Sequence, residues 1–152
     1  AKRVMIVDLD VHQGDGTASI FEHQDSVFTI SFHGQKNYPF KKQNSDFDLP
    51  FDDNTEDRAY LNALENHLPR LVDLVEPDFM FYLAGVDVLK TDKLGRLGLS
   101  MEGCKARDRF VLSLCKDQNF YLLQTLQCLA EQYRYNQMPK LLEETSSLLF
   151  QL

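Results

Sequence analysis

The run Val7-Asp8-Leu9-Asp10-Val11-His12-Gln13-Gly14-Asp15-Gly16 places acidic and imidazole side chains directly after a strongly apolar segment. Residues 4–7 are all apolar, which is typical of a strand in a parallel sheet that is covered on both faces. Because side chains alternate along a strand, we expect Asp8, Asp10 and His12 to point to one side and the apolar residues between them to the other. The run therefore predicts a group of polar ligands where a core strand emerges.

Two further segments have the composition of buried strands. Residues 27–32 are rich in β-branched and aromatic residues, and residues 79–84 are apolar and lead into another acid, Asp87. A short helix over residues 17–23 is predicted between the first two strands, and this strand, helix, strand order implies a right-handed parallel crossover. We expect an α/β fold with a parallel sheet flanked by helices.

The rest of the chain is predicted to be irregular or helical. Residues 35–54 lack sustained periodicity and are expected to form a long surface loop. Apolar residues at helical spacing over 55–75 predict a helix that is broken or kinked at Pro69, which cannot donate an interior hydrogen bond. Ser100 is expected to cap the next helix, and residues 120–152 are mostly helical in pattern.

Composition limits the class of protein. The chain has 152 residues, of which 43% are hydrophobic and 26% charged, which is ordinary for one soluble globular domain. Its formal net charge of -7 leaves no basic stripe, so direct nucleic-acid binding is not expected. No stretch approaches the roughly 20 apolar residues of a membrane span, so no membrane association is expected. Three cysteines without a C-x-x-C pair favour free thiols in a reducing compartment, the cytoplasm or the nucleus.

Three side chains are predicted to meet at the carboxyl edge of the sheet, where open parallel sheets bind their ligands. Asp10, His12 and Asp87 offer two oxygens and one nitrogen, the number of protein ligands that a catalytic zinc ion uses when it keeps a position open. Such an ion polarises a carbonyl group and activates water, so hydrolysis of an amide is the expected chemistry. The carboxylates would also accept Fe(II) or Mn(II). Asp8, behind Asp10, is expected to orient a histidine or to hold a second cation.

The same residues have a simpler interpretation. A run of alternating acids and a histidine at a strand end can serve loop capping and surface ion pairs alone. The Gly-Asp-Gly loop that follows, together with Asp87 after another strand, favours the metal site over this alternative.

Four segments resemble the histone deacetylase and acetylpolyamine amidohydrolase family. In order along the chain they are Asp-Leu-Asp-Val-His-Gln-Gly-Asp-Gly-Thr at 8–17, Ile-Ser-Phe-His at 30–33, Tyr-Leu-Ala-Gly-Val-Asp at 82–87 and Asp-Lys-Leu-Gly-Arg-Leu at 92–97. Gln13, where many members have a second histidine, and Tyr-Pro-Phe at 38–40 make the chain more similar to bacterial and class IV members than to class I.

The resemblance implies an arginase-like α/β fold, present here in part, and removal of an acetyl or other acyl group from the nitrogen of a lysine or a polyamine. It implies that Asp10, His12 and Asp87 bind Zn²⁺, with Fe²⁺ as an alternative. It also implies a structural K⁺ site formed by Asp8, Ser31 and His33 with the carbonyl groups of Asp10, His12 and Phe32, the start of a second monovalent-cation loop at Phe21, and a place at the substrate rim for Gly85.

The chain departs from the family pattern in two places. The family's general base belongs to a His-His pair upstream of the Asp-x-His motif, and the 152 residues contain no such pair. The family's transition-state tyrosine follows a glycine-rich turn, whereas residues 119–125 read Asn-Phe-Tyr-Leu-Leu-Gln-Thr, and Tyr121 is no substitute for it. Because a general base contributes about 10²–10⁴-fold, we expect no catalytic residue beyond the metal ligands and little or no activity.

We therefore expect a truncated deacetylase-like domain over residues 1–117 and a divergent helical tail over 118–152, in a chain that begins without Met. The expected ligand is an acylated lysine in a protein or an acylated polyamine, and protein complex partners are a further expectation. Two alternatives stay open. One is a non-catalytic interaction protein that keeps the fold and the metal, and the other is a non-functional gene fragment.

Overall fold

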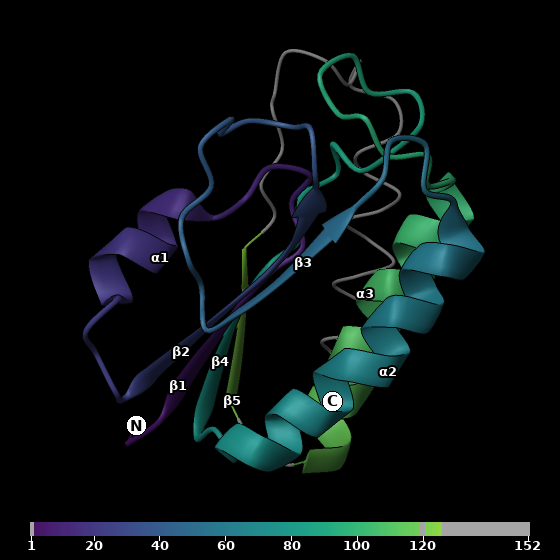
Figure 1. Ribbon diagram of the computed structural model, residues 1–152. Coiled ribbons are helices and arrows are strands. Elements are labelled where there is room, and N and C mark those ends of the chain that lie inside the picture. Colours follow the sequence, from purple (N-terminus) through teal and green to yellow (C-terminus); the bar gives the residue numbers. More distant parts are fainter. Residues whose placement is uncertain (1, 119–120, 126–152) are drawn as a thin grey trace.

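The computed structural model describes residues 2–118 and, as backbone, residues 121–125. Strands and helices alternate along most of the chain (Figure 1). In order, they are β1 (Val4–Asp8), α1 (Asp15–Phe21), β2 (Val27–Gly34), β3 (Phe47–Phe51), α2 (Asp57–Val75), β4 (Phe79–Leu83), α3 (Met101–Gln118) and β5 (Tyr121–Thr125).

The strands form one parallel sheet in the order β3-β2-β1-β4-β5. β1 lies in the middle, where Val7 pairs with Ile30 of β2 on one side and with Tyr82 of β4 on the other. The expected α/β fold on a parallel sheet is therefore confirmed. Because the strands run in the same direction, the carboxyl ends of β1 and β4 lie next to each other at one edge.

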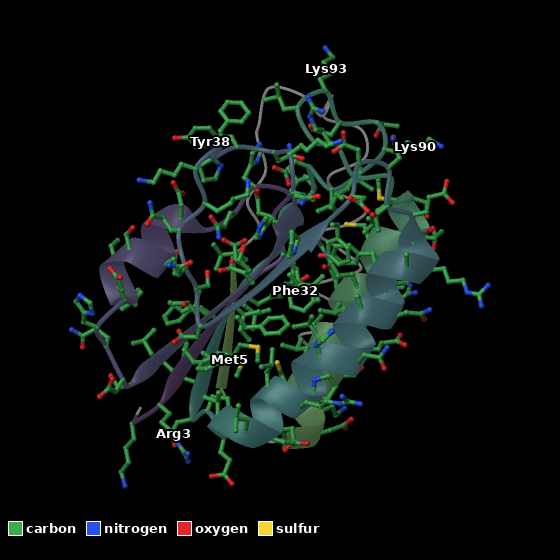
Figure 2. All side chains as sticks on the ribbon, viewed as in Figure 1. Arg3, Met5, Phe32, Tyr38, Lys90 and Lys93 are labelled. Atoms are coloured by element: carbon green, nitrogen blue, oxygen red, sulfur yellow. The ribbon has the colours of Figure 1, made fainter. Side chains whose placement is uncertain are left out.

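The hydrophobic core lies between one face of the sheet and the helices α2 and α3 (Figure 1). Met5 of β1 and Phe32 of β2 are fully buried, and Figure 2 shows both side chains in the space between the sheet and these helices. Each such side chain contributes about 1.5–3 kcal/mol relative to an exposed position. Helix α1 lies on the opposite side of the sheet (Figure 1). None of the described helices is long and apolar enough to span a bilayer.

The region expected to be a long loop, residues 35–54, contains a strand. Phe47–Phe51 form β3, which pairs with β2 along its whole length. Pro50 concealed this strand in the sequence, but an edge strand tolerates a proline that faces away from its partner. The rings of Phe47 and Phe51 pack against Phe32, with centroids 5.7 and 6.2 Å apart, and this burial outweighs the weak local pattern.

Of the two alternatives expected at Pro69, a broken or a kinked helix, the broken one is wrong, because residues 57–75 form a single helix. α2 contains Pro69 in its interior and buries Tyr60, Leu64, Leu68 and Val72 at a spacing of one turn. An interior proline costs about 3 kcal/mol or more because it removes a hydrogen bond. Packing of the buried face against the core therefore outweighs the local cost.

Other boundaries differ from the expectation in detail. Helix α1 begins at Asp15 rather than Thr17 and ends at Phe21. The Ser100 cap is confirmed, because its hydroxyl oxygen accepts the N–H of Gly103 at 3.0 Å. The helix expected from residue 120 is wrong for Tyr121–Thr125, which form β5, because pairing with β4 satisfies backbone groups that would otherwise stand unpaired at the edge of the sheet. The remainder of the expected tail, residues 126–152, lies outside the described residues.

Candidate metal centre

The candidate site forms where β1 and β4 separate. Their last ladder hydrogen bond joins the N–H of Leu9 to the carbonyl of Leu83 at 3.0 Å. Beyond this point Asp10 and His12 lie in the segment that follows β1, and Asp87 lies in the segment that follows β4. The parallel sheet thereby brings together side chains that are 75 positions apart in the chain.

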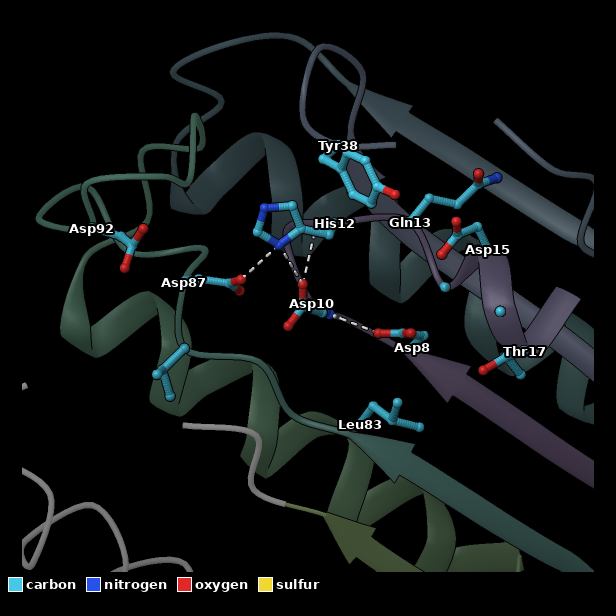
Figure 3. A pocket seen from close by; sticks show the side chains of 13 residues that line it. Asp8, Asp10, His12, Gln13, Asp15, Thr17, Tyr38, Leu83, Asp87 and Asp92 are labelled. Carbon is cyan, nitrogen blue, oxygen red and sulfur yellow. Dashed lines mark hydrogen bonds and ion pairs between the residues drawn. The ribbon is translucent and has the colours of Figure 1, made fainter. Parts of the chain in front are cut away.

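The structure places Asp10, His12 and Asp87 together, with one potential ligand atom from each lying within 4.8 Å of the others. Nδ1 of His12 is 3.0 Å from Oδ1 of Asp10 and 3.0 Å from Oδ2 of Asp87 (Figure 3). Around a zinc ion bound at about 2.0–2.2 Å, neighbouring ligand atoms lie roughly 3.3–3.5 Å apart. The distances from the His12 nitrogen to the two carboxylate oxygens are therefore close to the spacing that such an ion requires.

Backbone groups hold the acids in place. The N–H of Val11 donates to Oδ1 of Asp87 at 3.0 Å, and the N–H of His12 donates to Oδ1 of Asp10 at 2.8 Å. Asp8 has a similar role one step earlier, since its Oδ1 accepts the N–H of Asp10 at 3.0 Å. Asp87 is thus oriented by the segment that follows β1, and Asp8 and Asp10 are each oriented by the backbone two residues further along their own segment.

Hydrogen bonding and burial shift the protonation of these groups. Hydrogen bonds to Asp10 and Asp87 raise the pKa of His12 to about 10, so the metal-free chain holds an imidazolium between two acids at neutral pH. Burial raises the pKa of Asp87, and burial raises the pKa of Asp8 to about 7. Because only a neutral imidazole binds a metal, a cation at the triad has to displace the His12 proton.

A cavity of about 530 Å³ opens over the triad. In Figure 3, Tyr38 stands beside His12 on one side of the cavity and Asp92 lies on the other side. The acidic lining favours a cationic ligand or a metal ion. The lining residues are Asp8, Asp10, His12, Gln13, Gly14, Asp15, Gly16, Thr17, Tyr38, Leu83, Val86, Asp87 and Asp92.

Two glycines let the backbone pass close to the acids. A Cβ on Gly85 would lie 2.6 Å from both Cα and Oδ2 of Asp10, and a Cβ on Gly14 would lie 2.5 Å from Oδ2 of Asp8. Neither position can carry a side chain without displacing an acid. Gly85 is itself buried and is not among the residues that line the cavity, so its place at the substrate rim stays a prediction.

The residues expected to hold K⁺ lie on the sheet face opposite the core. Asp8 pairs with Ser31 in register, and Ser31 Oγ lies 3.1 Å from Nδ1 of His33 and accepts the N–H of Gly14 at 3.3 Å. Burial lowers the pKa of His33 and so favours its neutral form. Phe21 is the half-buried last residue of α1. The monovalent-cation roles of these residues stay predictions.

Gln13 has a role that the sequence did not reveal. Its amide pairs with the backbone of Gln43 in both directions, as Nε2 donates to the carbonyl at 2.8 Å and Oε1 accepts the N–H at 2.9 Å. Nε2 also donates to Oδ1 of Asp48 at 2.9 Å. This clip ties the segment that carries His12 to the end of the loop that carries Tyr38.

Arg107 is a second residue that the sequence analysis left without a role. It is fully buried in α3, and its Nη1 donates to the carbonyl groups of Leu9 at 3.1 Å and Gly85 at 2.7 Å. Helical spacing could have revealed it, because Cys104 and Val111 lie one turn before and after it on the same buried face.

Comparison with known sequences identifies the family. The model of the histone deacetylase domain matches residues 1–127. Over 115 residues the chain is 50% identical to an uncharacterized protein of Picosynechococcus sp., covering 76% of this chain and 38% of that protein. Over 124 residues it is 31% identical to histone deacetylase 2 of Arabidopsis thaliana, covering 80% of this chain and 32% of that protein. The chain thus spans about a third of the length of these relatives.

Solved structures agree. Acetylpolyamine aminohydrolase from Burkholderia pseudomallei superposes with a TM-score of 0.70 at 20% identity, covering 98% of this chain and 44% of that one. The HDA15 HD domain superposes with a TM-score of 0.68 at 25% identity, covering 99% of this chain and 44% of that one. These likenesses confirm the arginase-like deacetylase fold, present in part. The match of the histone deacetylase domain over most of the sequence shows that the chain belongs to the histone deacetylase family.

Proposed function

We propose that Asp10, His12 and Asp87 bind one divalent cation, Zn²⁺ in the first place, and that the cavity above it receives the acylated nitrogen of a lysine or polyamine. The observation that supports this most strongly is the convergence of one imidazole and two carboxylates within 4.8 Å, lining a cavity in a chain of the histone deacetylase family. Three protein ligands leave room for water and substrate on the ion.

The residues around the triad have separable tasks. A cation held by Asp10, His12 and Asp87 would supply Lewis-acid activation of the acyl carbonyl and of water. The N–H groups of Val11 and His12 hold the two carboxylates toward it. Tyr38 lines the cavity and packs edge-on against Phe40, with ring centroids 6.2 Å apart, so the Tyr38 ring offers an apolar surface to the aliphatic part of a substrate.

Among the described residues that line the cavity, none outside the proposed ligands is a histidine that could act as a general base. The only histidine among them is His12, which is a proposed ligand. A missing general base costs about 10²–10⁴-fold, so slow turnover by these 152 residues alone is expected. The same observation supports a second candidate, a protein that keeps the metal and binds an acylated partner without hydrolysing it.

Metal analysis tests the proposed centre. The chain, stripped of metal and dialysed against Zn²⁺, is expected to retain one ion, counted by elemental mass spectrometry. Asp87→Asn keeps the size of the side chain but removes a charged ligand, so affinity is expected to fall more than about 100-fold, beyond the 10–100-fold of outer partners. Asp15→Asn is the matched control, because Asp15 lines the same cavity outside the triad. Equal losses in the two variants, or no ion in the unmodified chain, would contradict the proposal.

Hydrolysis and binding assays separate the two candidate functions. An acetyl-lysine peptide and an N-acetylated polyamine are offered to the zinc-loaded chain and to Asp87→Asn. Slow hydrolysis that Asp87→Asn abolishes supports an amidohydrolase. Binding of the acetylated peptide over the unmodified one, without hydrolysis, supports the binding protein. Neither hydrolysis nor a preference for the acetylated ligand would overturn both.

A further inference from the structure

A buried arginine occupies the place where β1 and β4 separate. After their last ladder bond, from Leu9 to Leu83, the carbonyl groups of Leu9 and Gly85 both accept hydrogen bonds from Nη1 of Arg107, at 3.1 and 2.7 Å. Nη1 carries two hydrogens, so one nitrogen can serve both carbonyls at once. Arg107 thereby links the two chain segments beyond the point where backbone hydrogen bonds between β1 and β4 end.

The guanidinium of Arg107 is itself held in place by Asp108, on the side away from the two carbonyl groups. The residue has 0% exposure, its Nε donates to Oδ1 of Asp108 at 2.9 Å, and its Nη2 lies 2.9 Å from the same oxygen. The hydroxyl of Tyr82 in β4 also donates to this oxygen, at 2.5 Å. The buried charge is therefore paired, and its donors point in directions fixed by the planar group, which a lysine ammonium would not reproduce.

The two carbonyl groups belong to the segments that carry the triad. One is that of the residue before Asp10. The other, on Gly85, lies shortly before Asp87, and Gly85 approaches Asp10 so closely that a Cβ would lie 2.6 Å from its Cα. On the cavity side the N–H of Val11 donates to Asp87 at 3.0 Å. A change in the distance between the carbonyl groups of Leu9 and Gly85 would therefore also move the carboxylates of Asp10 and Asp87.

We propose that Arg107 is a positioning residue that sets the distance between the Asp10 and Asp87 carboxylates by bridging the ends of β1 and β4 from the core side. This inference rests on the metal centre proposed above. Arg107 is not among the residues that line the cavity, so it acts through the carbonyl groups of Leu9 and Gly85 rather than as a ligand. Replacing it should weaken cation binding while every ligand stays in the chain.

The first test compares the Zn²⁺ affinities of Arg107→Lys and Val111→Ala. Val111 is a fully buried residue of the same helix, so its truncation loosens the core without removing a donor to either carbonyl. Affinity is measured by chelator competition at a temperature where circular dichroism shows both variants folded. Arg107→Lys is expected to weaken binding about 10–100-fold, as outer partners of metal ligands do, and Val111→Ala is expected to leave it unchanged. If the loss of Zn²⁺ affinity were in proportion to the loss of Tm in both variants alike, the proposal would be overturned.

The second test needs no metal. Amide hydrogen exchange is followed at Val11, whose N–H donates to Asp87, and is compared with the amides of the buried face of α2. Arg107→Lys is expected to speed exchange at Val11 selectively, and Val111→Ala is expected to speed it only in step with the rest of the core. Exchange at Val11 that follows global stability in both variants would overturn the positioning role.

The two tests also separate this inference from the proposed function. If the unmodified chain binds no Zn²⁺ while exchange at Val11 rises selectively in Arg107→Lys, the metal centre fails and the positioning role stands. If Arg107→Lys does not fold, Asp108→Asn replaces it, because this change loosens the guanidinium while leaving its donors in the chain. The same selective pattern is expected in Asp108→Asn, and its absence would count against the role.

Discussion

A proton and a divalent cation compete for His12 between Asp10 and Asp87. Because hydrogen bonds to these acids raise the pKa of His12 to about 10, the metal-free chain keeps the proton through the neutral range. Each bound ion releases one proton, so Zn²⁺ affinity is expected to rise about tenfold per pH unit between roughly pH 6 and 9, or about 1.4 kcal/mol per unit. Chelator competition at successive pH values measures the slope. An affinity independent of pH would contradict this competition between the proton and the cation at His12.

The proton on His12 weakens Zn²⁺ binding, but it stabilises the metal-free fold. The folded-state pKa of His12 lies above its ordinary 6.5, so its stabilising effect is complete below pH 6.5 and is lost as the pH rises toward about 10. Asp8 changes the stability in the same direction, because burial raises its pKa from 3.8 to about 7 and its ionisation therefore destabilises the folded state. Urea unfolding is expected to show metal-free stability falling from about pH 6 to 9, while the zinc-loaded chain, already without that proton, keeps its stability. Parallel curves for the two forms would contradict this.

Gly85 is the backbone position on which the triad depends most directly. Gly85→Ala would place a Cβ 2.6 Å from Asp10 Cα and Oδ2, so Asp10 must move, and Zn²⁺ affinity is expected to fall at least about tenfold. Gly16→Ala is the matched control, because Gly16 lines the same cavity and a Cβ there would meet nothing within 4 Å. Metal titration of both variants decides. Unchanged affinity in Gly85→Ala would mean that Asp10 is not held by this contact.

At the scale of elements, one carboxylate joins the starts of α2 and α3. Asp57 accepts hydrogen bonds from the N–H of Ser100 at 2.7 Å and from its hydroxyl at 2.5 Å, and Ser100 in turn caps α3. Asp57→Ala is expected to lower the free energy of unfolding by about 1–2 kcal/mol. Glu56→Ala, at an exposed position without a capping bond, is expected to change it by less than about 0.5 kcal/mol. Urea unfolding of both variants checks this, and equal effects would show that the joint contributes nothing.

Some elements could be predicted from the sequence because their pattern is complete in itself. β1, β2 and β4 are buried or half-buried at every position; β1 and β4 have apolar runs, and β2 is rich in β-branched and aromatic residues. β3 could not be recognised, since Phe-Asp-Leu-Pro-Phe has the pattern of a strand only when β2 lies beside it. β5 has residues that suit either a helix or a strand, and pairing with β4 decides between them.

The site divides in the same way. Asp10, His12 and Asp87 could be singled out because each follows a strand whose end could be predicted, and parallel strands share an edge. The contribution of Gln13 could not be predicted, because it depends on Gln43 at the far end of a loop. Arg107 was missed for a related reason, since it meets a carbonyl group 98 positions away.

On the scale of the whole molecule, a bound ion would link the part of the chain that precedes α2, which carries Asp10 and His12, to the part that follows it, which carries Asp87. Zn²⁺ at about 100 times its Kd is expected to add about 2.7 kcal/mol to the stability, which raises Tm by about 5–10 °C for a domain of this size. Calorimetry with and without EDTA measures the shift. Asp87→Asn is expected to show no shift at the same Zn²⁺ concentration. A shift of equal size in Asp87→Asn would place the stabilising ion elsewhere.

The outer edge of β3 is poorly suited to receive another strand. The carbonyl of Phe51 accepts the N–H of Gln35, so the backbone groups of Phe51 face β2 and those of Pro50 face outward. Pro50 has no N–H to offer, so an incoming chain would find a donor missing near the end of this edge. The residue that concealed the strand in the sequence thus also removes one of the donors that a strand from a neighbouring molecule would need in order to extend the sheet on that side.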